Sequence, residues 1–356
     1  MNIRATTLLI FFAVLFAGHG AFAGNPDRQG EAGAYELLLS PWARVIGLSG
    51  MNTAGIQGID AMSLNIAGLS RMTGDMEVGV AHSIYLVGTG LGVNGLGFAT
   101  RVGKFGTLGI GLNAMDFGQI PVTMENLPEG TGATYSPRFY NLGLSYATTF
   151  EEKVSVGFTV RLISESIAQV GASGFSLDAG IQYVNGPKDY PQQFKFGVAL
   201  RNIGSNMVFG GQGLNHALTN PNTNVTLTYA ANGAGFELPS QLYIGASYDL
   251  IPVERNKLTF VGNFTSNAFS RDDIGGGLEF SLGGRFMLRA GYKYEIGSTT
   301  DATGESTKSV YTGICAGLSV RVPFNKENKS SLTIDYGYLA SNPWGGTHNL
   351  SVKMGF

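Results

Sequence analysis

Residues 349–356 read NLSVKMGF, in which apolar side chains alternate strictly with polar or small ones. A period of two is typical of a β-strand with one apolar face. The sequence stops on an aromatic residue inside this strand, so no tail shields the strand's edge. Such an edge favours aggregation in a soluble sheet, whereas in a closed barrel the last strand pairs with the first and no edge remains.

The composition favours strands over helices. The 356 residues are close to neutral (net charge −2), with 13% charged and 44% hydrophobic residues, a balance that indicates no nucleic-acid partner. The 53 glycines are about twice the usual share of ~7%, and 22 Phe and 15 Tyr stand against two Trp. We expect many strands that meet at crowded positions.

Residues 1–23 are typical of a signal peptide, with Arg4 before an apolar core and Ala21-Phe22-Ala23 as the cleavage site. No later apolar run reaches the ~18 residues of a membrane helix. Cys315 is the sole cysteine, so no internal disulfide forms and no lipid-anchor cysteine follows the cleavage site. An exported, apolar chain of this kind is either a large soluble β domain or an outer-membrane barrel.

The mature chain divides into two parts. Residues 24–74 are rich in glycine, with a short helical turn expected at residues 60–64, and we expect a plug or entry segment at the periplasmic mouth or inside a barrel. Residues 75–356 contain strand-like segments separated by turn signals. We count fourteen: 75–85, 88–101, 105–115, 137–150, 153–166, 175–184, 194–202, 239–250, 258–267, 274–282, 285–295, 311–322, 331–339 and 348–356.

Strand length and connector length favour a transmembrane antiparallel barrel. Most segments have nine to fourteen residues, which suits a tilted bilayer crossing. The long connectors 116–136, 203–238 and 296–310 would be extracellular, and the short ones at 102–104, 151–152 and 283–284 periplasmic. The first outer connector, of two residues, and an inner one at 185–193 depart from this pattern.

The alternation also assigns the two faces of the barrel. Aromatic residues expected to face lipid are Tyr140, Tyr146, Phe150, Tyr248, Tyr292, Tyr294, Tyr336 and Tyr338. Charged residues expected to face the lumen, together with Cys315, are Arg161, Asp178, Lys195, Glu279, Arg285, Arg289, Lys293, Glu295, Arg321 and Asp335. We interpret most of these charges as pairs across a filled barrel. The alternative is a selectivity path past Arg285, Arg289 and Lys293.

One block resembles the PorV/PorQ family, a branch of the FadL-like outer-membrane barrels. The matching positions are Ala43, Arg44, Gly47, Asn65, Ala67, Gly68 and Leu69, although Ile66 stands where the family usually has proline. The terminal Phe356 likewise resembles the assembly signal of outer-membrane barrels. The resemblance implies a place in the bacterial outer membrane, among its lipids. It also implies a non-enzymatic role in type IX protein secretion, with secreted cargo and translocon proteins as partners.

Other sites are less well supported by the sequence. The stretch 90–95 matches G-x-G-x-x-G but is followed by more strand, not by the helix that a dinucleotide site needs. His82, His216 and His348 share no metal-ligand spacing, so we expect no metal, no cofactor and no enzyme.

Apolar residues in two outer connectors are candidate partner contacts: Phe117, Ile120, Met124, Leu127, Met207, Val208, Phe209 and Leu214. They could instead fold over the barrel mouth and cover one another. Three functions remain open. One is a secretion component that binds protein through these loops. Another is a FadL-like channel for hydrophobic molecules such as long-chain fatty acids. The third is a structural barrel with no transport.

Overall fold

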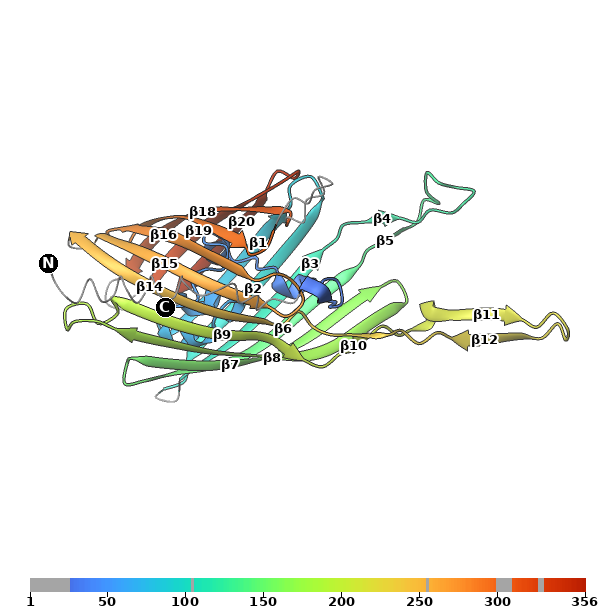
Figure 1. The fold of residues 1–356 in the computed structure, drawn as a ribbon, viewed down its shortest axis with the longest axis horizontal. Helices are drawn as coiled ribbons and strands as arrows, with labels where there is room; N and C mark the ends of the chain where they lie inside the picture. The colour runs from blue at the N-terminus through green and yellow to red at the C-terminus, as the bar shows by residue number, and fades with distance from the viewer. Residues whose placement is uncertain (1–25, 104–105, 254–255, 299–308, 326–329) are drawn as a thin grey trace.

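Fourteen antiparallel strands close into a single barrel (Figure 1). The structure is a computed structural model that describes residues 26–103, 106–253, 256–298, 309–325 and 330–356, so the predicted signal peptide lies outside the described residues. In barrel order the strands are β1 (Met76–Tyr85), β2 (Leu91–Arg101), β3 (Thr107–Asp116), β6 (Arg138–Phe150), β7 (Val154–Ile167), β8 (Val170–Asn185), β9 (Phe194–Gly204), β14 (Gln241–Val253), β15 (Asn256–Asn267), β16 (Asp273–Leu282), β17 (Phe286–Glu295), β18 (Tyr311–Asn325), β19 (Ser330–Ser341) and β20 (Thr347–Gly355). The predicted fold class and strand number are confirmed.

The barrel closes between β1 and β20, as the alternation at the end of the sequence predicts. Val80 lies opposite Val352, and Glu77 opposite Gly355. The Phe356 carbonyl accepts a hydrogen bond from the Asp75 backbone N–H (2.7 Å), and the Phe356 N–H donates to the Met76 carbonyl (2.9 Å). No strand edge is left open at this seam.

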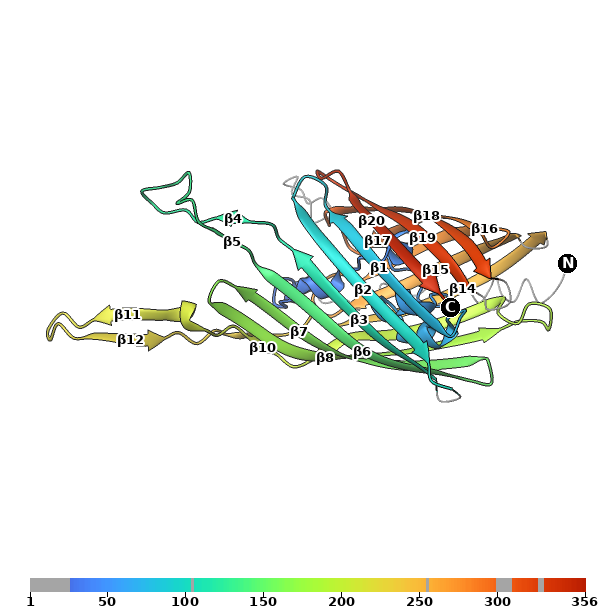
Figure 2. The same ribbon diagram turned by 180° about the vertical axis from the view of Figure 1, so that it is seen from behind.

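The two ends of the barrel differ in the length of their connectors. The long ones lie together at one end and form two arms (Figures 1 and 2). One arm contains β4 (Ile120–Pro121) and β5 (Thr134–Tyr135). The other contains β10 (Met207–Val208), η5 (Gln212–Leu214), β11 (Asn215–Thr219), β12 (Thr226–Ala230) and β13 (Gly235–Phe236). We call this the outer end, because outer-membrane barrels carry their long loops outside.

The first outer connector is longer than predicted. β2 begins at Leu91 rather than at residue 88, so five residues join it to β1. Leu86, Gly88 and Gly90 have positive φ angles of 46°, 104° and 75°, which extended strands do not adopt. The sequence shows the glycines but not the conformation that excludes them from the strand.

Side chains alternate between the two faces as predicted. On β6, Tyr140 and Leu144 are exposed on the outer surface, while Asn141 and Ser145 are buried toward the lumen. The lumen charges that are buried are Arg161, Asp178, Lys195, Glu279, Arg289 and Asp335. The prediction was wrong for Arg285, which lies exposed in the turn before β17 because Gly283 and Gly284 end β16 with positive φ.

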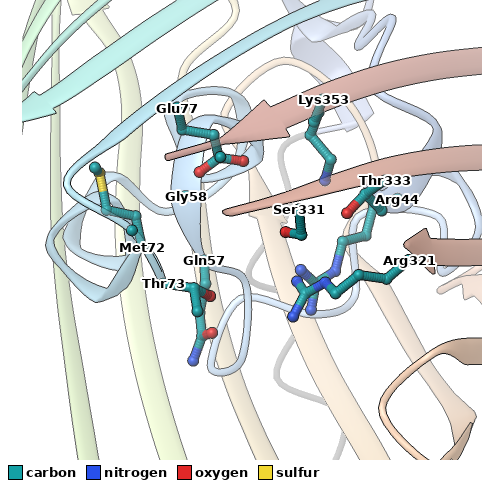
Figure 3. A pocket seen from close by; sticks show the side chains of 12 residues that line it. Arg44, Gln57, Gly58, Met72, Thr73, Glu77, Arg321, Ser331, Thr333 and Lys353 are labelled. Atoms are coloured by element: carbon teal, nitrogen blue, oxygen red, sulfur yellow. The ribbon is translucent and has the colours of Figure 1, made fainter. Parts of the chain in front are cut away.

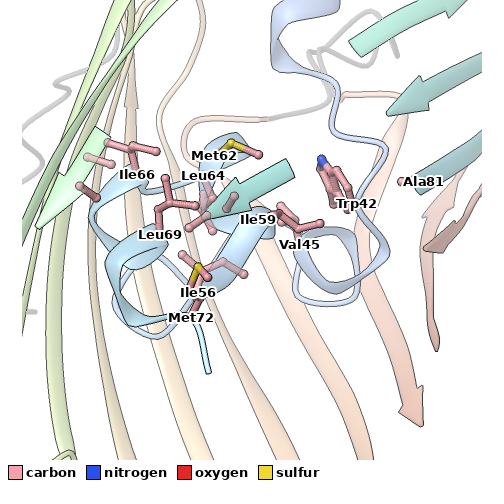
Figure 4. Packing of buried hydrophobic residues seen from close by; sticks show 14 of the residues in the cluster. Trp42, Val45, Ile56, Ile59, Met62, Leu64, Ile66, Leu69, Met72 and Ala81 are labelled. Carbon is pink, nitrogen blue, oxygen red and sulfur yellow. The ribbon is translucent and has the colours of Figure 1, made fainter. Parts of the chain in front are cut away.

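A plug formed by the N-terminal segment fills the lumen. Its short helices are η1 (Pro26–Arg28), η2 (Tyr35–Leu38), α2 (Ala43–Ile46), η3 (Gly58–Ser63) and η4 (Ile66–Arg71). In the described part of the chain, no helix is long and apolar enough to cross a membrane. Trp42, Ile59 and Leu69 belong to its buried apolar core (Figure 4). The helical turn expected at residues 60–64 corresponds to η3.

Candidate functional site

An apolar cluster occupies the outer half of the lumen, along one side of the barrel wall. Inward-facing residues near the outer ends of five neighbouring strands form it: Val93 on β2, Met115 on β3, Phe139 on β6, Ile163 on β7 and Ala172 on β8. We call these residues the outer apolar wall. Nearer the inner ends of the same strands, the inward-facing positions hold small or polar residues instead. The cluster therefore differs from the polar lumen expected for a pore.

The second outer connector covers this wall. Met207 on β10 is fully buried against it, and the rings of Phe209 and Phe236 pack at 5.4 Å between centroids. Phe117, at the base of the first arm, is partly buried at the same cluster. The apolar surface of the lumen thus continues into the bases of both outer connectors.

The start of the plug occupies the space beside the outer apolar wall. Leu37 of η2 is 2% exposed and belongs to the cluster, together with Ala34. Arg28 anchors the segment, since its guanidinium bonds Glu237 (2.8 Å) of the covering connector and lies 4.3 Å from the Phe269 ring centroid. Residues 26–39 therefore form a strap across the outer mouth, which fixes the side chain of Leu37 in the apolar space.

Charged side chains lie on strands beside and across the barrel from this wall. Arg201 on β9 lies 6.0 Å from the Tyr243 ring centroid and donates a hydrogen bond to the Leu37 carbonyl (3.4 Å). Lys293 on β17 pairs with Asp273 on β16 at 3.3 Å. We call this outer part of the lumen, which the strap occupies, the outer chamber; it combines the outer apolar wall with charged side chains.

Below this chamber, hydrogen bonds from the barrel wall hold the plug. Arg161 bonds the Met62 carbonyl and pairs with Asp178 at 2.7 Å. The amide of Gln182 donates to the Thr53 and Ile56 carbonyls at 3.1 and 3.0 Å. Because these partners are backbone oxygens of the plug, each bond satisfies a buried polar group that no helix or sheet satisfies.

The residues of the family-like block all lie in the plug. Asn65 caps η4 by accepting from the Ala67 N–H (3.2 Å) and donates to the Ile181 carbonyl of the wall (3.1 Å). Ala67, Gly68 and Leu69 are buried in η4, and Ala43 and Gly47 lie at the two ends of α2. The block therefore joins the plug to the barrel, while its match to the PorV/PorQ family stays a prediction.

The candidate contact residues divide into two groups. Phe117, Met207 and Phe209 pack into the lumen cluster, whereas Met124 (56% exposed), Leu127 and Val208 face outward. Ile120 and Leu214 are half-buried on the two arms. One part of the loops therefore folds over the barrel mouth, while for the exposed part partner contact stays a prediction.

Two polar cavities lie at the inner end of the lumen, and Arg44 and Gln57 line both of them. One, of about 40 Å³, is bounded by the plug and strands β1 and β18–β20 (Figure 3). The other, of about 170 Å³, contains Lys195, Asp249 and Lys257, with Asp249 2.7 Å from Lys195 and 3.2 Å from Lys257. Burial alone lowers the pKa of the Arg44 guanidinium, but Glu279, Asp60 and Asp335 nearby raise that pKa above its ordinary value.

Comparison with known proteins shows similarity only at the level of the fold. No family model and no curated protein matches the sequence. The toluene transporter TodX of Pseudomonas putida superposes with a TM-score of 0.52 at 12% identity, covering 89% of this chain and 97% of TodX. The chain has the fold of this outer-membrane transporter. The toluene transporter TbuX of Ralstonia pickettii gives a TM-score of 0.52 at 13% identity, with the same two coverages. A TodX deltaS2S3 mutant, described as a monoaromatic hydrocarbon channel, gives 0.53 at 12% identity.

This TodX-type fold agrees with the apolar outer surface of the barrel. Side chains such as Leu144 (55% exposed), Phe158 and Leu288 project from strand centres, and only lipid can cover them. The protein is an outer-membrane barrel. The similarity supports the predicted barrel fold, and no comparison shows the PorV/PorQ branch.

Proposed function

We propose that the protein is a non-enzymatic outer-membrane channel that admits small hydrophobic molecules through the outer chamber. The outer apolar wall, continuous with Phe209 and Phe236 at the mouth, is the observation that carries this proposal. A barrel with a polar lumen would not place five apolar side chains inward at adjacent strand ends. The hydrocarbon transporters that share the fold support the same substrate class.

In this proposal Leu37 stands where the ligand enters. Its side chain fills apolar space that a hydrocarbon or acyl chain would occupy, and displacement of the strap would release that space. The strap depends on few contacts outside the cluster, chiefly the Arg28–Glu237 pair and the short bridge between Ala32 and Glu237. Salt bridges that are this exposed contribute little, typically up to about 1 kcal/mol, so the strap can be displaced.

Uptake of labelled toluene and labelled dodecanoate by cells producing the full-length protein tests this function. Phe139→Gln places a polar amide in the outer apolar wall, and we expect it to lower uptake severalfold at equal protein level. Leu218→Gln, on the exposed arm, is the matched control and should leave uptake unchanged. Uptake equal to that of cells without the protein, or insensitive to Phe139→Gln, would count against the channel.

A second candidate function is protein binding by the long arm, as the PorV/PorQ resemblance implies. No Asp, Glu, Lys or Arg occurs between Ser205 and Phe236. The β11–β12 hairpin presents an apolar face, on which Leu218 lies opposite Leu227 and His216 opposite Tyr229. Leu218 and Leu227 are 59% and 51% exposed, and both hairpin edges are unpaired in the described part of the chain. Such an edge can pair with a strand of another protein.

A pull-down from detergent-solubilised outer membrane distinguishes the two functions. The tagged protein is compared with a variant in which Leu218 and Leu227 are both changed to Asn. The control changes Thr219 and Thr226, which pair on the opposite face of the hairpin. Secreted or translocon proteins that are lost only with the leucine variant would support protein binding. Capture of lipid alone by every variant would support the channel.

A further inference from the structure

The smaller cavity at the inner end brings two arginines together from different parts of the molecule. Arg44 belongs to α2 of the plug, and Arg321 to the inner part of β18. Figure 3 shows both guanidinium groups at one side of the cavity, with Glu77 at the opposite side. Further polar residues of the lining are Gln57, Thr73, Ser331, Thr333 and Lys353.

Unlike most cations of the lumen, these two arginines have no carboxylate partner within 4.0 Å among the described residues. Lumen cations that do pair with a carboxylate within 4.0 Å include Arg161, Lys195, Arg289, Lys293 and Lys353. Arg44 and Arg321 form no such pair with any described residue, and the Nε atom of each is buried without a hydrogen-bond partner there. Their charges act on each other directly, since Arg44 opposes the charge of Arg321.

Two half-buried guanidinium groups that line one cavity repel each other, and an anion between them would offset this repulsion. The surrounding carboxylates Glu77, Glu279 and Asp335 balance their charge from a distance but satisfy no N–H group. A guanidinium presents five N–H donors in a planar fork, which matches the two oxygens of a carboxylate or the oxygens of a phosphate. One oxyanion between the two forks would satisfy both Nε atoms.

We propose that this cavity binds a small oxyanion, a carboxylate or a phosphate group, between Arg44 and Arg321. The cavity volume of about 40 Å³ fits such a head group and not a whole drug-sized molecule, which needs ~300 Å³ or more. Bound there, the anion links the plug to the barrel wall at the inner mouth. The site stands on its own geometry and does not depend on the function proposed above.

Calorimetric titration of the full-length protein in a non-ionic detergent at low ionic strength tests the site. The probes are sodium phosphate and sodium octanoate, each added separately. We expect saturable binding of at least one probe, and Arg321→Gln should weaken it about tenfold or more, because a charge-assisted pair of bonds is lost. Arg285→Gln removes the same charge from an exposed turn at the same end of the barrel and should bind as the wild type does.

The two probes separate the possible sources of the anion. Binding of phosphate alone identifies the ligand as a phosphate group, and binding of octanoate alone identifies it as a carboxylate. Binding of both means that the site recognises negative charge in either group. If Arg321→Gln does not reach the folded, heat-modifiable form on gels, Arg44→Gln replaces it in the titration. A weak specific site has a dissociation constant of ~1 mM. If the wild type shows no saturable binding at probe concentrations up to about 10 mM, the proposal is overturned. Equal binding by Arg321→Gln also overturns it.

Discussion

Lys353 joins three elements through a single ammonium group. It lies on β20 and contacts Asp60 of the plug and Asp335 of β19, which is 3.1 Å away. Asp60 is fully buried, and Asp335 also accepts a hydrogen bond from Ser319. The group is thus a buried ion triad whose members all lose water on folding.

Lys353→Met should lower the free energy of unfolding by about 3–5 kcal/mol, because it leaves two carboxylates buried beside each other without a cation. Urea unfolding in detergent micelles, followed by tryptophan fluorescence, measures the change. Lys153→Met is the control, since Lys153 is exposed in the inner turn after β6. Equal unfolding midpoints for Lys353→Met and the wild type would show that the triad is not needed.

Gly317 on β18 lets the plug approach the wall closely. A Cβ atom at this position would lie 2.9 Å from the Gly47 Cα atom and 3.3 Å from the Tyr336 carbonyl oxygen. Both neighbours are backbone atoms, so neither can move aside cheaply.

Gly317→Ala should therefore destabilise the protein by about 1–3 kcal/mol, the usual cost of overpacking. The same urea titration measures this. Gly262→Ala provides the comparison, because its Cβ would meet nothing within 4 Å. A Gly317 variant as stable as the Gly262 variant would mean that α2 can shift away from β18.

At the scale of elements, strands in the barrel and strands in the arms expose similar side chains to different surroundings. Leu144, midway along β6, is 55% exposed, and Leu218 on β11 is 59% exposed. Only Leu144 lies at the depth of the bilayer, so exposure alone does not distinguish lipid from water.

Leu144→Arg should cost about 2–4 kcal/mol in a lipid bilayer, the range for a cation at the bilayer midplane. Leu218→Arg should change stability by less than about 0.5 kcal/mol, as is usual for a surface site. Unfolding in lipid vesicles measures both. Similar effects of the two substitutions would place β6 outside the bilayer or the arm against it.

The sequence predicts the barrel strands well because their alternation extends over many residues. The predicted bounds of β6 and β7 agree with the structure to within one residue. On β6, Tyr140 faces outward and Asn141 inward, and on β7, Leu162 faces outward and Arg161 inward. This alternation allows only one assignment of the two faces. The sequence does not predict the arm strands, because β11 and β12 are short segments in a connector rich in Asn, Thr and Gly.

The outer apolar wall could not be predicted for a different reason. Phe139 and Ile163 are apolar residues at inward positions, next to apolar outward neighbours such as Tyr140 and Leu162. Near these strand ends both faces are apolar, so the contrast that marks the lumen disappears. The inner cavity was also missed, since Arg44 and Arg321 are far apart in the sequence and meet only through the plug.

For the whole molecule, the main feature is the plug that fills the lumen. Its core residues lie across the lumen (Figure 4), and wall residues from β7, β8 and β20 bond its backbone. We expect the intact protein to show no sustained ion conductance in planar bilayers.

Removal of residues 26–72 should produce a stable conducting pore, because a barrel of this width has space for water once the plug is absent. Single-channel recording measures this change. Replacement of residues 215–230 by a short Gly-Ser link, which shortens the long arm, is the control and should remain silent. A silent barrel without residues 26–72 would indicate that the outer connectors close the lumen unaided.

The position of Asn349 has a consequence for the order of biogenesis. Its side-chain amide, on β20, donates hydrogen bonds to the Ser40 and Pro41 carbonyls (both 3.0 Å), and β20 also pairs with β1. The plug is therefore bonded to the strand that closes the barrel. We expect the chain lacking residues 26–72 to mature more slowly than the wild type in pulse-chase experiments, because the N-terminal part acts as an internal template. Faster maturation of the shortened chain would mean that sealing comes first and the template enters afterwards.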